Sequence, residues 1–146
     1  MKDKLVLTIH VVLDKEGVVG FETPAGRVKM LPFAGTVESE IFNGIVAPCG
    51  VDTQVTNRVG VRNMSAKYML IGKDKEGQDC HIFVDNEGYF TPGQPPKPYF
   101  ETVPTFITDS KCLAPYLMRN QFRGEGHSRP DGTGPDILFF EVVDEY

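Results

Sequence analysis

The chain has 146 residues, of which 40% are hydrophobic and 10% aromatic, and its formal net charge is −5. This length predicts one domain, residues 1–146, large enough to bury a core. Its well-mixed charges disfavour a protein that binds nucleic acid or an anionic membrane surface, and no apolar run approaches the ~20 residues of a membrane-spanning helix.

The first predicted element is a strand over residues 4–13, which has apolar side chains on both faces and is therefore expected to be covered. Because this segment lacks a small-residue cleavage site, we do not interpret it as a signal peptide. Residues 18–21 could continue as a hairpin, and a turn is expected at residues 23–26. A longer strand is predicted over residues 37–46, followed by a bend at Pro48 and Gly50.

Residues 51–58 alternate cleanly between apolar and polar side chains. Val51 and Val55 point one way, and the polar side chains of Asp52, Gln54, Thr56 and Arg58 point the other way. This polar face could lie in solvent. Alternatively, it could form the polar wall of a cavity, in which Asp52 and Arg58 orient a ligand, since a closed barrel can hold one small ligand in its lumen.

Two more strands are predicted, over residues 61–71 and 78–84, and a turn signal at residues 85–88 follows the second. In the first of them, one face carries Met64, Ala66, Tyr68 and Leu70, and the opposite face carries Asn63, Ser65 and Lys67. In the second, Cys80, Ile82 and Val84 lie opposite Asp79, His81, Phe83 and Asp85. The regular succession of short strands and turns indicates a small all-β barrel or sandwich.

The last third of the chain is less regular. Residues 91–98 contain four prolines and predict a stiff connector, with a lid as the alternative. A strand over residues 99–108 is followed by one short helix over residues 110–120, capped by Asp109 or Ser110. Residues 124–134 are expected to form a glycine-rich loop, and residues 137–143 a buried closing strand.

Cys49, Cys80 and Cys112 are odd in number and far apart, which indicates reduced thiols in a cytoplasmic protein. No close Cys or His pair predicts a metal site, and we expect no cofactor. Cys112 has no nearby base to activate it as a nucleophile. The glycines of residues 124–130 do not make a phosphate-binding loop, because the third glycine is missing and no helix follows.

Four ionisable residues are candidates for proton transfer. Of the three histidines, His10, His81 and His127, His81 is the best candidate, because it lies in mid-strand and could sit in a barrel mouth as an acid or base. Glu141 lies between apolar neighbours, where burial would raise its pKa. A satisfied structural or surface role is the alternative for each.

Residues 42–54, a strand with a glycine that leads to a proline-glycine bend and then an aspartate, resemble the signature of the domain of unknown function 3237 family. The similarity continues in order through the following positions: Arg58, Gly60, residues 66–68, Leu70, residues 82–88, residues 99–106, Tyr116, Leu117, Phe122 and Gly124. The resemblance implies a compact antiparallel β-barrel with a central cavity, lipocalin-like or allene-oxide-cyclase-like in outline. It also points to Asp52, Gln54, Arg58 and Tyr68.

The leading hypothesis is a barrel that binds a small amphipathic organic molecule. Its expected ligand-binding residues are Asp52, Gln54, Arg58, Tyr68, His81, Phe100 and Phe106, with Phe83 as a further aromatic wall. The first alternative is a cofactor-free isomerase, cyclase or lyase on the same barrel, which would use a carboxylate or histidine for proton transfer. The second is an interaction module without a ligand, in which homo-oligomerisation covers the outer apolar face.

Overall fold

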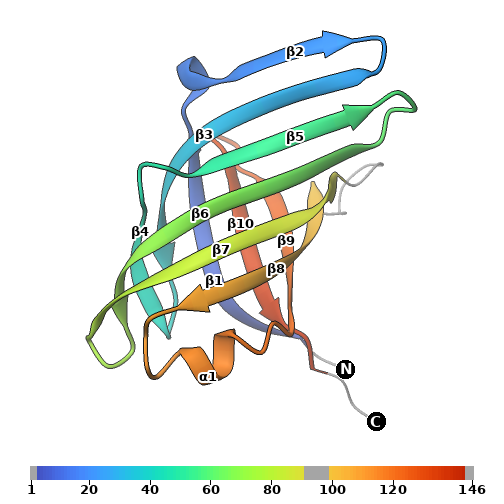
Figure 1. The fold of residues 1–146 in the computed structure, drawn as a ribbon. Helices are drawn as coiled ribbons and strands as arrows, with labels where there is room; N and C mark the ends of the chain where they lie inside the picture. Colours follow the sequence, from blue (N-terminus) through green and yellow to red (C-terminus); the bar gives the residue numbers. More distant parts are fainter. Residues whose placement is uncertain (1–2, 91–98, 144–146) are drawn as a thin grey trace.

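The computed structural model describes residues 3–90 and 99–143, which contain one antiparallel sheet of ten strands (Figure 1). In chain order the strands are β1 (Lys4–Leu13), β2 (Val19–Thr23), β3 (Gly26–Glu38), β4 (Phe42–Val46), β5 (Val51–Asn57), β6 (Arg62–Asp74), β7 (Asp79–Phe90), β8 (Phe100–Thr108), β9 (Phe122–Ser128) and β10 (Pro135–Glu141). A 3-10 turn, η1 (Lys15–Gly17), links β1 to β2, and a short helix, α1 (Ala114–Leu117), precedes β9.

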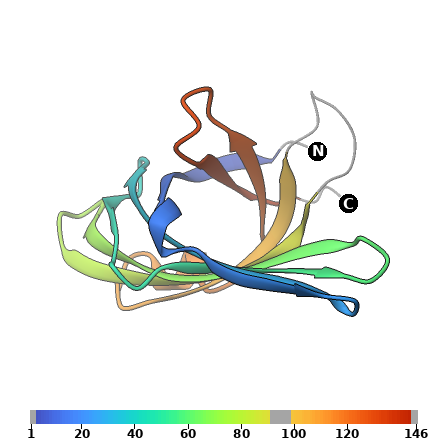
Figure 2. The same cartoon turned by 90° about the horizontal axis from the view of Figure 1, so that it is seen from above.

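The sheet closes on itself because β1 pairs with β10 on one side and with β3 on the other. Strands β4 and β5 both pair with β3 and β6, at different heights, and so share one position in the ring. The barrel therefore has eight positions around its axis, and β2 is an added strand on β3. Seen from above, β9 and β10 lie across the barrel from β5 and β6 (Figure 2). This architecture confirms the predicted all-β barrel with at most one short helix.

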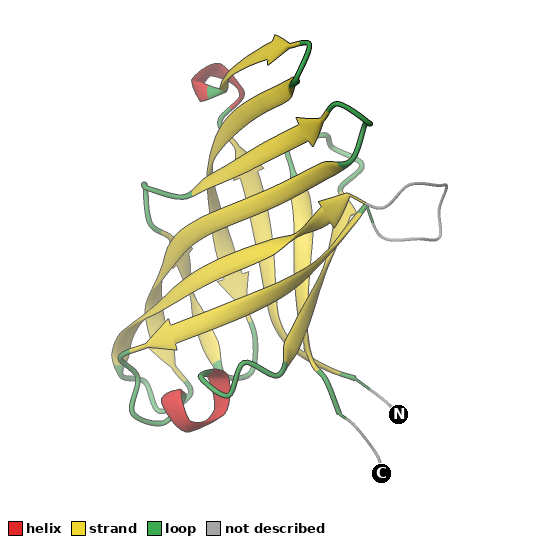
Figure 3. Cartoon of the chain, turned by 45° about the vertical axis from the view of Figure 1, so that its right-hand side comes forward, coloured by secondary structure: helices red, strands yellow, loops and turns green. Residues whose placement is uncertain are grey.

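Successive side chains of a strand point alternately into and out of the barrel, so every second residue contributes to its interior. On β6 the shared face predicted for Met64, Ala66, Tyr68 and Leu70 is buried. Near α1, the red helix at the lower end of Figure 3, the Phe106 ring packs edge to face against Phe122 and Phe139. Leu113 and Leu117 are also fully buried there. This end of the barrel is a packed core.

The strand predicted over residues 37–46 is in fact two strands. β3 begins at Gly26 and ends at Glu38, and β4 begins at Phe42. Between them, Ser39 Oγ accepts hydrogen bonds from the backbone N–H groups of Ile41, at 3.2 Å, and Phe42, at 2.9 Å. Because Ser39 fits an alternating pattern as well as a turn, the sequence pattern did not reveal this hairpin.

The turn predicted at residues 85–88 is wrong, because β7 continues to Phe90. Asn86 is completely buried on the inner face. On the outer face, Lys67 Nζ lies 3.5 Å from a carboxylate oxygen of Asp85 and 3.4 Å from one of Glu87. Asparagine and acidic residues are common in turns, so this segment was predicted to be one. Pairing with the neighbouring strands keeps its backbone extended.

The glycine-rich loop predicted over residues 124–134 is wrong in its first half, where β9 runs to Ser128. A Cβ atom on Gly126 would lie 2.1 Å from the Phe100 ring, and one on Gly124 would lie 2.3 Å from Thr102 Oγ1. These glycines therefore make room for the side chains of β8 inside the barrel, and they do not mark a turn.

The remaining predictions differ in outcome. The predicted helix is reduced to α1, with Leu113 N–H donating to Ser110 Oγ at 3.2 Å, and Met118 is exposed. In β1 the register shifts between Leu5 and Leu7, so Leu5 faces outwards. The predicted strand over residues 99–108 and the closing strand are confirmed as β8 and β10.

The proline-rich connector, residues 91–98, lies outside the described residues. Within the described ranges, neither helix is long and apolar enough to cross a membrane.

Candidate functional site

An open space remains inside the barrel at the end away from α1. We call it the lumen pocket, and its volume is about 170 Å³. Most of its lining is apolar or aromatic, including Leu31, Phe33, Met64, Phe90 and Phe100. The polar lining residues are Asp52, Gln54, Arg62 and Tyr99. An apolar space with a few converging polar groups is typical of a site for a small organic molecule.

Sheet register orders the residues along one wall of the barrel. Three successive rows cross β3, β5 and β6: Leu31, Asp52 and Ala66; then Lys29, Gln54 and Met64; then Arg27, Thr56 and Arg62. Successive rows are about 7 Å apart, because every second residue of a strand faces inwards. The wall therefore changes from mainly apolar at the depth of Asp52 to cationic at the open end.

A chain of hydrogen bonds joins Asp52 to Arg62. The Arg62 guanidinium donates through Nε to Gln54 Oε1 at 3.1 Å, and Gln54 Nε2 donates to Asp52 Oδ2 at 2.7 Å. Burial raises the pKa of the Asp52 carboxyl, although Gln54 and Arg62 act in the opposite direction. The other oxygen, Oδ1, is buried without a partner among the described residues. Asp52 is thus a carboxyl group that gains from a donor in the pocket.

Tyr68 lies deeper in the barrel and presents a second unpartnered oxygen. Its ring packs edge to face against Phe33, with ring centroids 5.2 Å apart. Its hydroxyl is buried and has no hydrogen-bond partner in the described part of the chain. Burial, together with the nearby Asp52 charge, holds the pKa of Tyr68 well above its usual value. The hydroxyl is therefore neutral at physiological pH and can donate a hydrogen bond.

Asn86 and Thr102 extend this polar group to the neighbouring strands. Asn86 is the cross-strand partner of Ala66, two strands from Asp52, or about 10 Å away across the wall. Neither its amide oxygen nor its amide nitrogen has a partner among the described residues, and the same holds for Thr102 Oγ1. Buried polar atoms are nearly always hydrogen-bonded in folded proteins, so four such residues on the inner wall are exceptional.

Aromatic rings hold Arg62 at the mouth of the pocket. Its guanidinium carbon lies 3.5 Å from the centroid of the Phe90 ring, and Nη1 donates to Tyr99 Oη at 3.2 Å. The Phe90 ring in turn packs against Tyr99 and Phe100, with centroids 4.9 and 5.6 Å apart. This arrangement fixes a positive charge beside an aromatic surface.

The structure brings together only some of the predicted site residues. Asp52, Gln54 and Phe100 line the lumen pocket, and Tyr68 lies behind Phe33. The cavity-wall interpretation of the polar face of β5 therefore agrees with the geometry, whereas the solvent-facing one does not. Arg58 does not share this face, because β5 ends at Asn57 and Arg58 lies exposed in the following turn.

Three other predicted residues lie elsewhere. His81 is on the outer surface, where its Nδ1 is 2.7 Å from Asp109 Oδ2. Phe83 shares that outer face, since its neighbours Ile82 and Val84 are the buried residues. Phe106 does face inwards, but it belongs to the packed core near α1 and does not line the pocket.

The other candidate acids and bases are occupied by local partners. Glu141 accepts hydrogen bonds from Tyr116 Oη and Arg119 Nη2, both at 2.8 Å, and these lower its pKa. The predicted raised pKa is therefore wrong. His10 and His127 each contact a carboxylate, of Asp136 at 2.8 Å and of Glu125 at 3.0 Å. None of these residues lines the lumen pocket.

Sequence reasoning missed several residues of the site. Arg62 could have been found, because it stands two positions before Met64 and so belongs to the same face of β6. Asn86 was hidden by its turn-like neighbours, and Tyr99 and Phe90 flank the proline-rich residues 91–98. No signal in the sequence indicated that these aromatic rings would meet Arg62.

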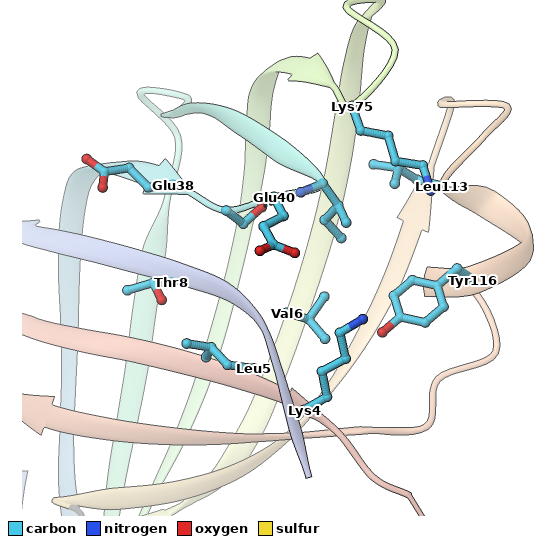
Figure 4. Close-up of a pocket in the computed structure, with 11 residues that line it drawn as sticks. Lys4, Leu5, Val6, Thr8, Glu38, Glu40, Lys75, Leu113 and Tyr116 are labelled. Carbon is cyan, nitrogen blue, oxygen red and sulfur yellow. Dashed lines mark hydrogen bonds between the residues drawn. The ribbon is translucent and has the colours of Figure 1, made fainter.

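A second cavity, of about 430 Å³, lies near the start of β1 (Figure 4). Lys4, Glu40 and Tyr116 point into it, and Lys75 and Leu113 lie at its edge. The Tyr116 hydroxyl is already bonded to Glu141. Among the residues described, none that lines this cavity has a buried polar side-chain atom without a partner. The lumen pocket is therefore the better candidate site, although it is smaller.

Metal and thiol chemistry have no built site in the described part of the chain. No group of three His, Cys, Asp or Glu side chains there could hold a metal ion. The three cysteines are free, and burial raises the pKa of the Cys80 thiol to about 11. Acid–base groups and hydrogen-bonding side chains are what the lumen pocket offers.

Comparison with known proteins gives a consistent picture. A family model described as a protein of unknown function (DUF3237) matches residues 2–142. UPF0311 protein CA_C3321 of Clostridium acetobutylicum is 31% identical over 119 residues, 72% of this chain and 73% of that protein. A solved structure of a protein with unknown function from the same organism has a TM-score of 0.79 at 28% identity, over 98% of this chain and 100% of that one. The conserved protein of unknown function RPA1785 from Rhodopseudomonas palustris has a TM-score of 0.75 at 26% identity, over 97% of both chains.

Proposed function

The chain belongs to the DUF3237 family of proteins of unknown function, and we propose that it binds a small organic molecule in the lumen pocket. One observation carries this proposal: the inner wall holds Asp52, Tyr68, Asn86 and Thr102, each with a buried polar atom that lacks a partner. Leaving such an atom unsatisfied costs about 1–3 kcal/mol. Of these four residues, Asp52 lines the lumen pocket itself, and a bound molecule with a hydroxyl group would satisfy its free oxygen.

The size and lining of the pocket support a ligand built on a single ring. An apolar cavity of about 150 Å³ is enough to hold benzene, and the lumen pocket has about 170 Å³. Phe33, Phe90 and Phe100 supply flat apolar surface. The Asp52 carboxyl also lines the pocket, so a ring with a polar substituent matches the pocket better than a plain hydrocarbon.

Catalysis by proton transfer is a second candidate, and the Asp52 carboxyl favours it. Its pKa is raised by burial, and one of its oxygens is free of partners. A carboxyl with a raised pKa is a stronger base than an ordinary carboxylate, and it can take up a proton from a ligand and return it. This would suit a cofactor-free isomerase, cyclase or lyase. An enzyme of this kind would keep ligand binding but lose turnover in Asp52→Asn.

Binding can be tested first by native mass spectrometry of the freshly purified protein, and then by titration with p-cresol, a ring with one hydroxyl. We expect p-cresol to bind, and we expect Asp52→Ala to weaken binding by about tenfold, because Asp52 lines the pocket with a free oxygen and one buried hydrogen bond is worth roughly 1.4 kcal/mol. Toluene, which lacks the hydroxyl, should not distinguish the two proteins.

Asp79→Ala is the matched control, because Asp79 is an exposed aspartate of β7 that pairs with Lys73 outside the pocket. It should bind p-cresol as the unmodified protein does. If neither p-cresol nor a co-purifying molecule binds, and the protein is oligomeric through its outer face, the interaction module without a ligand is the better account.

A further inference from the structure

A small third cavity adjoins the lumen pocket on its open side. It has a volume of about 110 Å³ and is lined by Arg27, Lys29, Gln54, Thr56 and Arg62. Gln54 and Arg62 line both cavities. A ligand in the lumen pocket could therefore extend into this adjoining space, which we call the basic mouth.

The basic mouth carries more positive charge than its surroundings balance. Arg27 has one carboxylate partner, Glu22, at 3.3 Å, and both side chains are more than half exposed. In the described part of the chain, Lys29 and Arg62 form no ion pair, and Arg62 is held by Gln54, Tyr99 and Phe90 instead. Three cations thus face one ion-paired acid, Glu22, and the carboxyl of Asp52 one row deeper, in a protein whose net charge is −5.

Sheet register places two of these cations on either side of a hydroxyl group. Thr56 pairs with Arg27 of β3 on one side and with Arg62 of β6 on the other, so the two arginines are about 10 Å apart across the wall. Lys29 lies in the next row, beside Gln54. Arginine side chains bind carboxylates through paired hydrogen bonds, and a carboxylate above Thr56 would lie within reach of both guanidinium groups.

From this geometry we propose that the ligand is a small aromatic carboxylate, with its ring in the lumen pocket and its carboxylate in the basic mouth. This inference rests on the proposed function and names the chemical class of its ligand. The rows of the wall match such a molecule in order: a cationic end, then the amide of Gln54, then the aromatic and apolar lining with the unpartnered oxygen of Asp52. A positive mouth on an acidic protein would also steer anions towards the pocket.

The test compares two probes of nearly equal size that differ in charge: 3-(4-hydroxyphenyl)propanoate and the corresponding primary amide. Isothermal titration calorimetry should show that the carboxylate binds about tenfold more tightly than the amide, as expected for one charge-assisted contact. Its affinity should fall as salt concentration rises, whereas the affinity of the amide should not.

The double variant Arg27→Gln/Lys29→Gln should remove this preference and leave the affinity for the amide unchanged. Lys73→Gln is the matched control, because Lys73 is exposed and paired with Asp79 outside the pocket. The carboxylate assignment would be overturned by equal affinities for the two probes in the unmodified protein, or by a preference that survives in the double variant. In either case, binding of p-cresol would still support the lumen site. If p-cresol and both probes all fail to bind, the proposed function falls as well.

Discussion

Asp52 shows how one residue can be costly to the fold and useful to the site. It is an acid on the inner wall of a barrel, and among the residues described only Gln54 gives it a hydrogen bond from a side chain. Burial without a full set of partners penalises the ionised form, which is why its pKa is raised. A buried acid with a perturbed pKa is more typical of a functional site, where a ligand completes its hydrogen bonds, than of a purely structural position.

The first prediction follows from that raised pKa. The folded protein holds the Asp52 proton more tightly than the unfolded chain does, so the contribution of Asp52 to stability is present below its ordinary pKa and is lost as pH rises through the raised value. Asp52→Asn should therefore be more stable than the unmodified protein at about pH 7, with a smaller difference at about pH 4. Urea denaturation at the two pH values measures this difference.

Asp109→Asn is the control with the opposite sign. Hydrogen bonds from His81 lower the pKa of Asp109, so its contribution is present at neutral pH and is lost as pH falls. This variant should be less stable at neutral pH, and the deficit should shrink in acid. Parallel pH profiles for the two variants would contradict the assignment of Asp52 as a buried, penalised carboxyl.

At the scale of elements, the close packing of β8 against β9 requires glycine at two positions of β9. β8 pairs with β9 over only three residue pairs, from Phe100 and Gly126 to Thr102 and Gly124. Both glycines face the barrel interior, and the space that their side chains would fill holds the Phe100 ring and the Thr102 hydroxyl. Small residues on β9 thus allow an aromatic wall for the lumen pocket on β8.

The second prediction concerns Gly126→Ala. The new methyl group would overlap the Phe100 ring, and we expect a loss of about 1–3 kcal/mol in the free energy of unfolding, as for other overpacked cores. Because Phe100 lines the pocket, binding of p-cresol should weaken too. Ser128→Ala, at an exposed position of the same strand, is the control for a change to alanine in β9. Wild-type stability in Gly126→Ala would show that the ring moves aside at little cost.

At the scale of the molecule, the barrel is closed but unevenly protected. β6 and β7 lie within the ring, with partners on both sides, whereas β2 pairs only with β3 and every one of its residues is exposed. Val19 and Phe21 are 72% and 63% exposed, and their partners Met30 and Val28 continue the same outer face. An edge strand of this kind is the part of a sheet most open to local unfolding or to another chain.

The third prediction is that amide hydrogens of β2 exchange much faster than those of β6, by roughly a hundredfold or more. Hydrogen exchange followed by mass spectrometry measures this ratio, and β10, which pairs with both β1 and β9, is the control for a strand near the chain end. Protection of β2 equal to that of β6, lost on dilution, would instead indicate that a second copy covers the outer face.

Much of the fold could be read from the chain itself. The period of two along β5 and β6 predicted which residues share a face, and turn residues separated many of the strands. The pattern failed where polar or glycine residues lie inside, as at Asn86 and Gly126, because composition does not distinguish a turn from an inward position in a barrel.

What the sequence by itself determined was therefore the β-barrel class and the shared face of Asp52 and Gln54. Only the tertiary structure decided that this face points inwards, that Arg62 and not Arg58 joins it, and that His81 lies outside. The physical reason is that alternation sets the relative direction of neighbouring side chains, whereas the inner side is set by closure, here by the pairing of β1 with β10 and β3. Those contacts join residues far apart in the chain, so no local pattern contains them.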